Sequence, residues 1–273
     1  MSISAPNSPE QSSVPSWSRY VAIGDSFTEG LNDVDPHNPF QYRGWADVLA
    51  ASLAKRQREA GVQPLEYANL AVRGRLIDNI VGEQLEQALD LKPDLVSIIA
   101  GGNDILRPAV NIDLISLRLE RAIIKLRQAG IDVLMGTGMD ARHSPIVNKT
   151  RGRTALYNAN IWSIARRHGA YVLDLWGMRP LLDWRMWSED RIHLTTEGHR
   201  RVTQAALVGL GLTPDDLHWA QPLEELPPAA QIDKMRDDAA WLKNHVFPWA
   251  TRRLRRTSSG ANKEAKRPEP EQL

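Results

Sequence analysis

Short apolar runs with high β propensity alternate with longer amphipathic segments between residues 19 and 211, and this alternation is the strongest constraint on the fold. The runs are almost continuously apolar, which is typical of parallel strands that helices cover on both faces. They span residues 20–23, 65–70, 95–100, 132–137 and 171–175. Five strands that alternate with helices predict a three-layer α/β domain ending near Gly211.

The helical segments carry apolar residues three and four positions apart. The clearest stripe precedes the fourth strand and consists of Ile112, Ile115, Leu119, Ile123 and Leu126. Gly130 follows it as a stop signal. Similar segments span residues 44–58, 75–91, 153–168 and 196–210.

The regions outside this domain have a different composition. Residues 1–18 are rich in Ser and Pro and predict a flexible leader, followed by the domain at 19–211. Residues 212–256 form an appendage with several prolines, a helical stretch at 231–247 and a basic cluster at 252–256. The last segment, 257–273, has few apolar residues and is expected to be disordered.

Composition excludes several kinds of chemistry. The chain has no cysteine, so disulfides, a thiolate nucleophile and Cys-ligated metal centres are excluded. No apolar run approaches the roughly 20 residues that span a bilayer, and the N-terminal segment lacks a signal-peptide pattern. We therefore expect a cytoplasmic protein. A net charge of +1 gives no general reason to expect binding to nucleic acid.

The basic appendage allows three interpretations. Its apolar and basic residues could form an amphipathic element on an anionic membrane surface. They could instead pack against the α/β body, which we favour because exposed apolar patches are uncommon on monomers. They could also cover the interface of a homo-oligomer. Pro248 predicts a kink in this segment or two short helices.

Ligands of parallel α/β sheets bind beyond the carboxyl ends of the strands, and four segments there carry unusual residues. GDSFTEG follows the first strand, NLAVRG the second and GGND the third. DRIHLTTEGH follows the fifth strand after a loop. Ser26 in the first segment lies on a tight turn that can expose its hydroxyl, although Gly-Asp-Ser also describes an ordinary turn.

Asp190 and His193 have the spacing that places two side chains on one side of a helical turn or tight loop. A serine nucleophile needs a base to take its proton and a carboxylate to orient that base. In isolation the pair also fits an acidic residue near a helix start with a surface histidine nearby. Asn103, with the N–H groups of Ser26 and Gly74, could stabilise an oxyanion; alternatively, Asn103 and Gly74 are turn residues.

Together these residues resemble the SGNH hydrolases, also called the GDSL esterase/lipase family. The resemblance covers about residues 19–211 and implies a flavodoxin-like fold with strand order 2-1-3-4-5. It implies Ser26 as nucleophile, His193 as base and Asp190 as its acid partner. It also implies an oxyanion hole made by Ser26, Gly74 and Asn103. Phe27 stands where many members have Leu, and Arg73 where relatives often have a small or polar residue.

Several neighbouring residues have weaker assignments. Asp25, Arg73 and Trp187 are candidate substrate-binding residues, although a carboxylate such as Asp25 more often organises a loop and tryptophans more often close a core. His199 could suggest a metal site with Asp190, but the helix predicted after Thr196 would turn it away. We therefore predict no metal and no cofactor.

The sequence thus predicts a serine esterase or lipase that acts on a small-molecule ester through an acyl-enzyme. Thioesters and acetylated carbohydrates are alternative substrates, since the same residues serve all three. A non-catalytic small-ligand or carbohydrate module on this fold is a second hypothesis. Flavin mononucleotide binding at the first loop is a third, but it does not predict the Asp190 and His193 pair.

Overall fold

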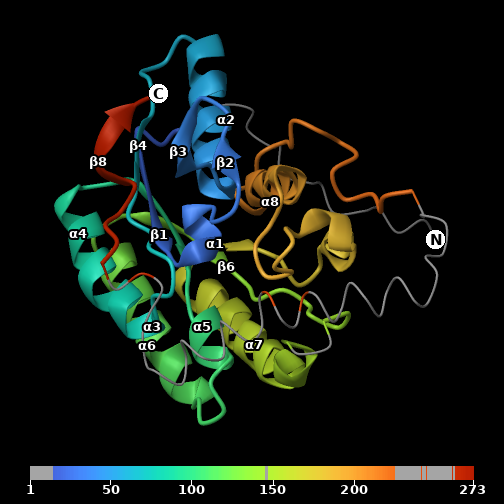
Figure 1. The fold of residues 1–273 in the computed structure, drawn as a ribbon. Coiled ribbons are helices and arrows are strands. Elements are labelled where there is room, and N and C mark those ends of the chain that lie inside the picture. Colours follow the sequence, from blue (N-terminus) through green and yellow to red (C-terminus); the bar gives the residue numbers. More distant parts are fainter. Residues whose placement is uncertain (1–14, 145–146, 225–240, 242–243, 245–259, 261) are drawn as a thin grey trace, which may run out of the picture.

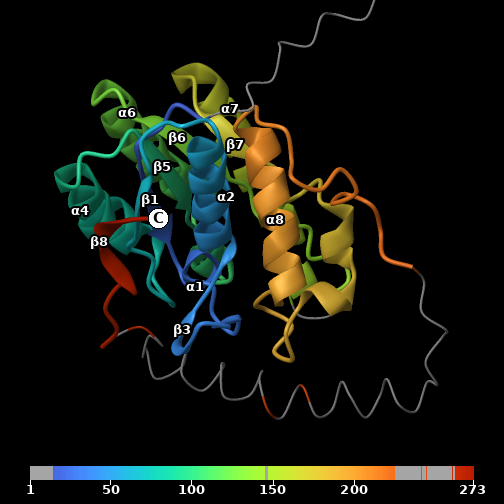
Figure 2. The ribbon, with the colours of Figure 1, turned by 90° about the horizontal axis from the view of Figure 1, so that it is seen from above.

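The protein has a central, mostly parallel sheet with helices on both faces (Figure 1). The computed structural model describes residues 15–144, 147–224, 241, 244, 260 and 262–273. Helices α2 (Trp45–Glu59) and α8 (Thr196–Gly209) lie side by side on one face (Figure 2). The other face is covered by α4 (Leu85–Asp90), α6 (Ile112–Gln128) and α7 (Arg151–His168). The predicted three-layer α/β fold is confirmed.

Within the described residues, the sheet has six strands in the order β7-β6-β5-β1-β4-β8. They are β1 (Arg19–Gly24), β4 (Glu66–Asn69), β5 (Leu95–Ile99), β6 (Asp132–Gly136), β7 (Tyr171–Leu173) and β8 (Arg267–Gln272). The first five coincide with the five predicted runs and pair in parallel. Numbered among themselves they follow the expected order 2-1-3-4-5.

The sixth strand corrects the prediction of a disordered tail at 257–273. β8 pairs antiparallel with the edge strand β4, and the N–H of Leu273 donates to the carbonyl of Leu65 over 3.0 Å. The ammonium group of Lys266 donates to the carbonyls of Glu29 and Tyr42 and to the Asp47 carboxylate. Backbone pairing and buried polar contacts hold this strand. A strand held in this way does not need an apolar pattern, so the polar sequence did not predict it.

The domain also begins earlier than predicted, because the last residues of the predicted leader, 1–18, already contact it. Trp17 is 7% exposed and donates its indole N–H to Asp132 over 2.9 Å. The N–H of Ser18 donates to Asp94 over 2.7 Å. Residues 1–14 lie outside the described residues. So do the predicted helix at 231–247, apart from Trp241 and Asn244, and the basic cluster at 252–256.

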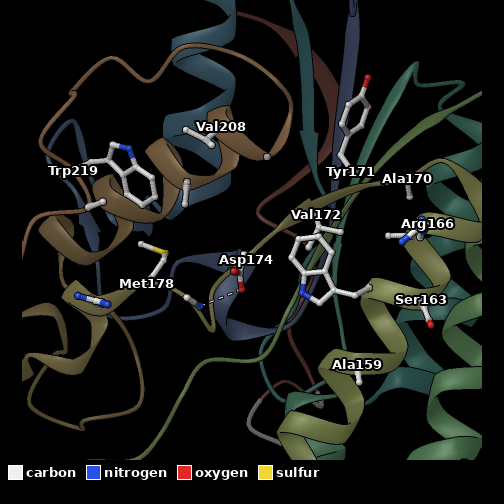
Figure 3. Close-up of a pocket in the computed structure, with 17 residues that line it drawn as sticks. Ala159, Ser163, Arg166, Ala170, Tyr171, Val172, Asp174, Met178, Val208 and Trp219 are labelled. Atoms are coloured by element: carbon white, nitrogen blue, oxygen red, sulfur yellow. Dashed lines mark hydrogen bonds between the residues drawn. The ribbon is translucent and has the colours of Figure 1, made fainter. Parts of the chain in front are cut away.

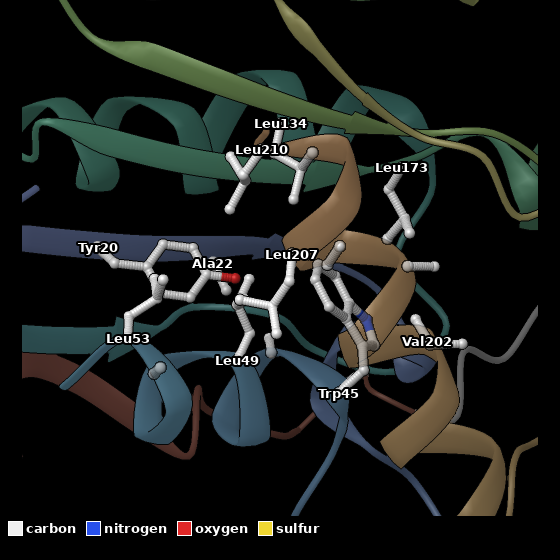
Figure 4. Packing of buried hydrophobic residues seen from close by; sticks show 14 of the residues in the cluster. Tyr20, Ala22, Trp45, Leu49, Leu53, Leu134, Leu173, Val202, Leu207 and Leu210 are labelled. Carbon is white, nitrogen blue, oxygen red and sulfur yellow. The ribbon is translucent and has the colours of Figure 1, made fainter. Parts of the chain in front are cut away.

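Two hydrophobic clusters join the layers. In the first, side chains of the sheet meet those of α2 and α8 (Figure 4). Its fully buried members include Tyr20, Leu134 and Leu173 from strands, Leu49 and Leu53 from α2, and Leu207 from α8. The second cluster packs the opposite face of the sheet against α4, α6 and α7. Because both faces are covered, the strands read as apolar runs rather than as alternating patterns.

The remaining elements are short. They are α1 (Ser26–Glu29), α3 (Ile77–Asn79), α5 (Gly102–Ile105), a hairpin of β2 (Val34–Asp35) with β3 (Asn38–Tyr42), and 3₁₀ turns over Val147–Thr150, Arg179–Leu182 and Trp184–Met186. The helix predicted at 75–91 is divided by a π-helical turn, Ile80–Gln84. At its end, the Gln84 side chain bonds both the N–H and the carbonyl of Gly24, just before the Ser26 turn.

Candidate active site

Five predicted site residues meet in one cavity at the carboxyl edge of the sheet. The cavity has a volume of about 930 Å³, and its lining includes Ser26, Gly74, Asn103, Asp190 and His193. They come from the segments that follow β1, β4, β5 and β7, as the position of ligand sites in parallel sheets predicts.

Ser26 is the first residue of α1, a single turn that begins immediately after β1. The Asp25 carboxylate caps this turn by accepting the Phe27 N–H over 3.1 Å. Gly24 lets the strand turn sharply: a Cβ there would lie 2.6 Å from the Thr28 hydroxyl and 2.9 Å from the Ile99 carbonyl. The sequence therefore holds the Ser26 hydroxyl at the end of the central strand, facing the cavity.

The side chains of Ser26, His193 and Asp190 form a continuous hydrogen-bonded chain. His193 Nε2 lies 2.9 Å from Ser26 Oγ, and His193 Nδ1 lies 2.6 Å from Asp190 Oδ2. An ionised carboxylate can only accept, so Nδ1 carries the proton and donates to Asp190. Nε2 is then an acceptor for the Ser26 hydroxyl. The two side chains of the Asp190–His193 pair are each 15% exposed, so water reaches this pair only in part.

Asp190 is held by several donors besides the imidazole. Its Oδ1 accepts the N–H groups of Ile192 and His193, both over 2.9 Å, and the Ser188 hydroxyl over 2.9 Å. Its Oδ2 accepts the Asn32 amide over 2.7 Å. Burial acts to raise the pKa of the Asp190 carboxyl, but the hydrogen bond and charge of His193 and the backbone donors together hold this pKa well below its usual range. The carboxylate is therefore ionised at neutral pH.

The three predicted oxyanion residues also face the cavity. Gly74 has a φ of 72°, in the left-handed region, so the loop after β4 can turn its backbone at this point. Asn103 lies in α5, and its amide nitrogen donates to Asp25 Oδ2 over 3.1 Å and to the Arg75 carbonyl over 3.0 Å. Both of these bonds fix the orientation of the Asn103 side chain at the cavity wall.

The three candidate substrate-binding residues have different positions. Asp25 lines the cavity but is only 8% exposed, and each of its carboxyl oxygens accepts a hydrogen bond from the protein. Burial raises the pKa of Asp25 to about 6. Trp187 also lines the cavity, and its indole N–H donates to the Leu181 carbonyl over 2.8 Å. Arg73 is absent from the cavity lining, and its guanidinium pairs with the Glu29 carboxylate instead.

Sequence reasoning missed three residues of this region. Asn32 and Ser188 support Asp190, and Trp241 donates its indole N–H to the Asp190 carbonyl over 2.8 Å. The sequence around a polar residue does not show which side chain that residue contacts in the fold. Trp241 lies fifty-one positions from Asp190, so only the fold shows their contact.

His199 is a buried packing residue of α8. It is 1% exposed, and its Nδ1 accepts the Trp45 N–H over 3.1 Å. Burial lowers its pKa to about 3, so the imidazole is neutral. Among the residues that the structure describes, no three His, Asp or Glu side chains are grouped as a metal site would require.

A second cavity lies away from these residues, beside the edge strand β7 (Figure 3). It has a volume of about 1140 Å³ and is lined from α7, β7 and α8, with Trp219 and Met178 on one side. Asp174 accepts the Gly177 N–H there over 3.1 Å. Because Ser26 and His193 are absent from its lining, this cavity is not part of the candidate active site.

The four sequence blocks, gathered around one cavity on this three-layer fold, are those of an ester-hydrolysing enzyme. The chain belongs to the GDSL-like Lipase/Acylhydrolase family, whose model matches residues 22–201. The resemblance inferred from the sequence is therefore confirmed. None of the curated protein sequences compared with the chain matches it.

Several solved structures share this fold. LAE5, an α/β hydrolase enzyme from the metagenome of Lake Arreo, Spain, is 22% identical with a TM-score of 0.58, over 71% of this chain and 95% of its own. Axe2, an acetylxylan esterase from Geobacillus stearothermophilus, is 18% identical with a TM-score of 0.59, over 75% and 100%. TesA is 20% identical with a TM-score of 0.56, over 70% and 97%.

Within the described part of the chain, every helix is too short or too polar to cross a membrane.

Proposed function

We propose that the protein is a serine esterase that cleaves small-molecule esters through an acyl-enzyme formed on Ser26. The observation that carries this proposal is the hydrogen-bonded chain of Ser26, His193 and Asp190 in the wall of a 930 Å³ cavity. Nucleophile, base and orienting carboxylate stand in the order that acyl transfer requires.

In the first half of the reaction, Ser26 Oγ attacks the acyl carbonyl while His193 Nε2 takes the hydroxyl proton. The ionised Asp190 stabilises the imidazolium that forms. The tetrahedral intermediate collapses when the bond to the alcohol oxygen breaks, and His193 gives its proton to that oxygen. The alcohol leaves and the acyl group remains on Ser26.

In the second half, water replaces the alcohol. His193 takes a proton from the attacking water and returns it to Ser26 Oγ as the acid leaves. The N–H groups of Ser26 and Gly74 and the amide of Asn103 stabilise the oxyanion in both halves. Asn103 does so by exchanging one of its present bonds, to Asp25 or to Arg75, for the substrate oxygen.

The cavity favours an ester with an apolar portion. Much of its lining is aliphatic or aromatic, including Leu31, Ile105, Leu106, Met139, Leu182 and Trp184. Its volume also exceeds the need of an acetyl group. Acetylated carbohydrates, the substrate class in the name of Axe2, and thioesters are the alternatives.

Labelling and hydrolysis test this proposal together. A fluorophosphonate should label the wild type and the control Ser163→Ala, whose residue lines the second cavity, but not Ser26→Ala. Hydrolysis of p-nitrophenyl acetate should follow the same pattern. A Ser26→Ala protein that is labelled and active like the wild type would falsify the proposal. A series of acyl lengths, an acetylated xylo-oligosaccharide and a thioester then identify the substrate class.

A further inference from the structure

Trp241 reaches the candidate active site from outside the part of the chain that the family model matches, residues 22–201. Its side chain is 5% exposed and lines the same cavity as Ser26 and His193. The residue therefore forms part of the wall that faces a bound substrate.

Trp241 also contacts the backbone that carries Asp190. Its indole N–H donates to the Asp190 carbonyl over 2.8 Å. The next residue, Arg191, has a φ of 56°, a left-handed conformation that a residue with a Cβ rarely adopts. The Asp190–Arg191 link is thus strained and needs support from its surroundings.

Two tryptophans supply that support. The Arg191 guanidinium lies 5.0 Å from the ring centroid of Trp241 and 5.4 Å from that of Trp184. Both distances fit cation–π contacts. Trp241 therefore holds the link twice, at the Asp190 carbonyl and at the Arg191 side chain. The Asp190 carboxylate on this link is the partner of His193.

We propose that Trp241 is a positioning and specificity-determining residue of this esterase. Its N–H fixes the Asp190–Arg191 link and thereby the orientation of His193, and its ring forms the apolar wall for the larger part of the ester. This inference rests on the proposed function of Ser26, His193 and Asp190.

Two substitutions separate the two roles. Trp241→Phe keeps an aromatic wall but removes the N–H donor. kcat should therefore fall about tenfold on every ester, since the hydrogen bond that fixes the Asp190 backbone is lost. KM should change little. The midpoint of the pH profile of kcat/KM should shift as well, because the carboxylate that orients His193 is less well fixed.

Trp241→Ala removes the wall too. KM for p-nitrophenyl octanoate should rise about tenfold, the factor that one or two buried methylene groups supply, while KM for the acetate stays nearly constant. The ratio of kcat/KM for octanoate to that for acetate should therefore fall about tenfold. This ratio is measured in one sample, so it is independent of the folded fraction.

Matched controls are available at Trp219, which lines the second cavity. Trp219→Phe and Trp219→Ala should behave as the wild type on both esters. Fluorophosphonate titration gives the concentration of competent sites in every variant. The inference would be overturned if both Trp241 variants kept the wild-type kcat, pH profile and ester ratio. In that case an inactive Ser26→Ala would still support the proposed function. An active Ser26→Ala would instead remove the proposed function.

Discussion

The amide of Asn103 donates a 3.1 Å hydrogen bond to the carboxyl group of Asp25, the residue immediately before Ser26. This contact joins the segment after β5 to the segment after β1 in the wall of the cavity. Asp25 therefore organises the site rather than offering a free carboxylate to a substrate. Its two oxygens connect the cap of α1, through Phe27, with the orientation of Asn103.

Replacing Asn103 with alanine should lower kcat more than it changes KM. Loss of one donor to a developing oxyanion typically costs about 10²–10³ in kcat. Steady-state kinetics on p-nitrophenyl acetate measure the effect. Asn111→Ala is a control for amide loss elsewhere, because the Asn111 side chain caps α6 by accepting the Leu114 N–H and is absent from the cavity lining. A kcat of Asn103→Ala within a factor of three of the control would exclude Asn103 as an oxyanion donor.

The buried carboxyl of Asp25 should make the stability of the fold depend on pH. Burial raises its pKa from 3.8 to about 6, so the folded state binds this proton more tightly than the unfolded state does. The stabilisation from this group is fully present below pH 3.8 and is lost as the pH rises through about 6. Between these limits the loss amounts to about 2–3 kcal/mol of the free energy of unfolding.

Asp25→Asn should remove this dependence, since its amide does not ionise. Urea unfolding of both proteins between pH 4 and pH 7 measures it. The free energy of unfolding of the wild type should fall relative to that of Asp25→Asn as the pH rises. A constant difference across this range would show that the Asp25 carboxyl does not titrate there.

Asp190→Asn should reduce activity strongly while leaving Ser26 in place. The neutral side chain no longer stabilises the imidazolium or fixes its tautomer, a change that costs about 10⁴ in kcat in a Ser-His-Asp triad. Ser188→Ala removes only one of the donors to Asp190 and should cost far less. Single-turnover acylation by a p-nitrophenyl ester measures both variants. Equal rates for Asp190→Asn and Ser188→Ala would contradict the role of Asp190.

Patterns over a few neighbouring residues predicted the parallel strands, the main helices and the four site segments. The buried parallel strands read as apolar runs, and the stripe from Ile112 to Leu126 marks α6 because one face of that helix is buried. The four site blocks were found since each follows a predicted strand, and all four contribute to the cavity. The order of the five parallel strands came from the family resemblance rather than from the patterns.

The parts that escaped prediction depend on long-range contacts. β8 is polar and is held by pairing with β4 and by Lys266. Asn32 and Trp241 have no unusual sequence neighbours, and their importance comes only from their contacts with Asp190. Arg73 was selected because it precedes Gly74. In the structure its guanidinium pairs with Glu29, and Arg73 is not part of the cavity lining.

The Lys266 ammonium should contribute strongly to stability although it lies seven residues from the C-terminal Leu273. Its side chain is 12% exposed, and it donates to the carbonyls of Glu29 and Tyr42 and to Asp47 over 2.6–2.8 Å. Lys266→Met would leave these acceptors buried without their donor, at a cost of about 2–4 kcal/mol in the free energy of unfolding. Lys263→Met, at an exposed position, should be nearly neutral. Chemical denaturation of the two variants distinguishes them, and equal midpoints would mean that the Lys266 ammonium contributes little to the stability of the fold.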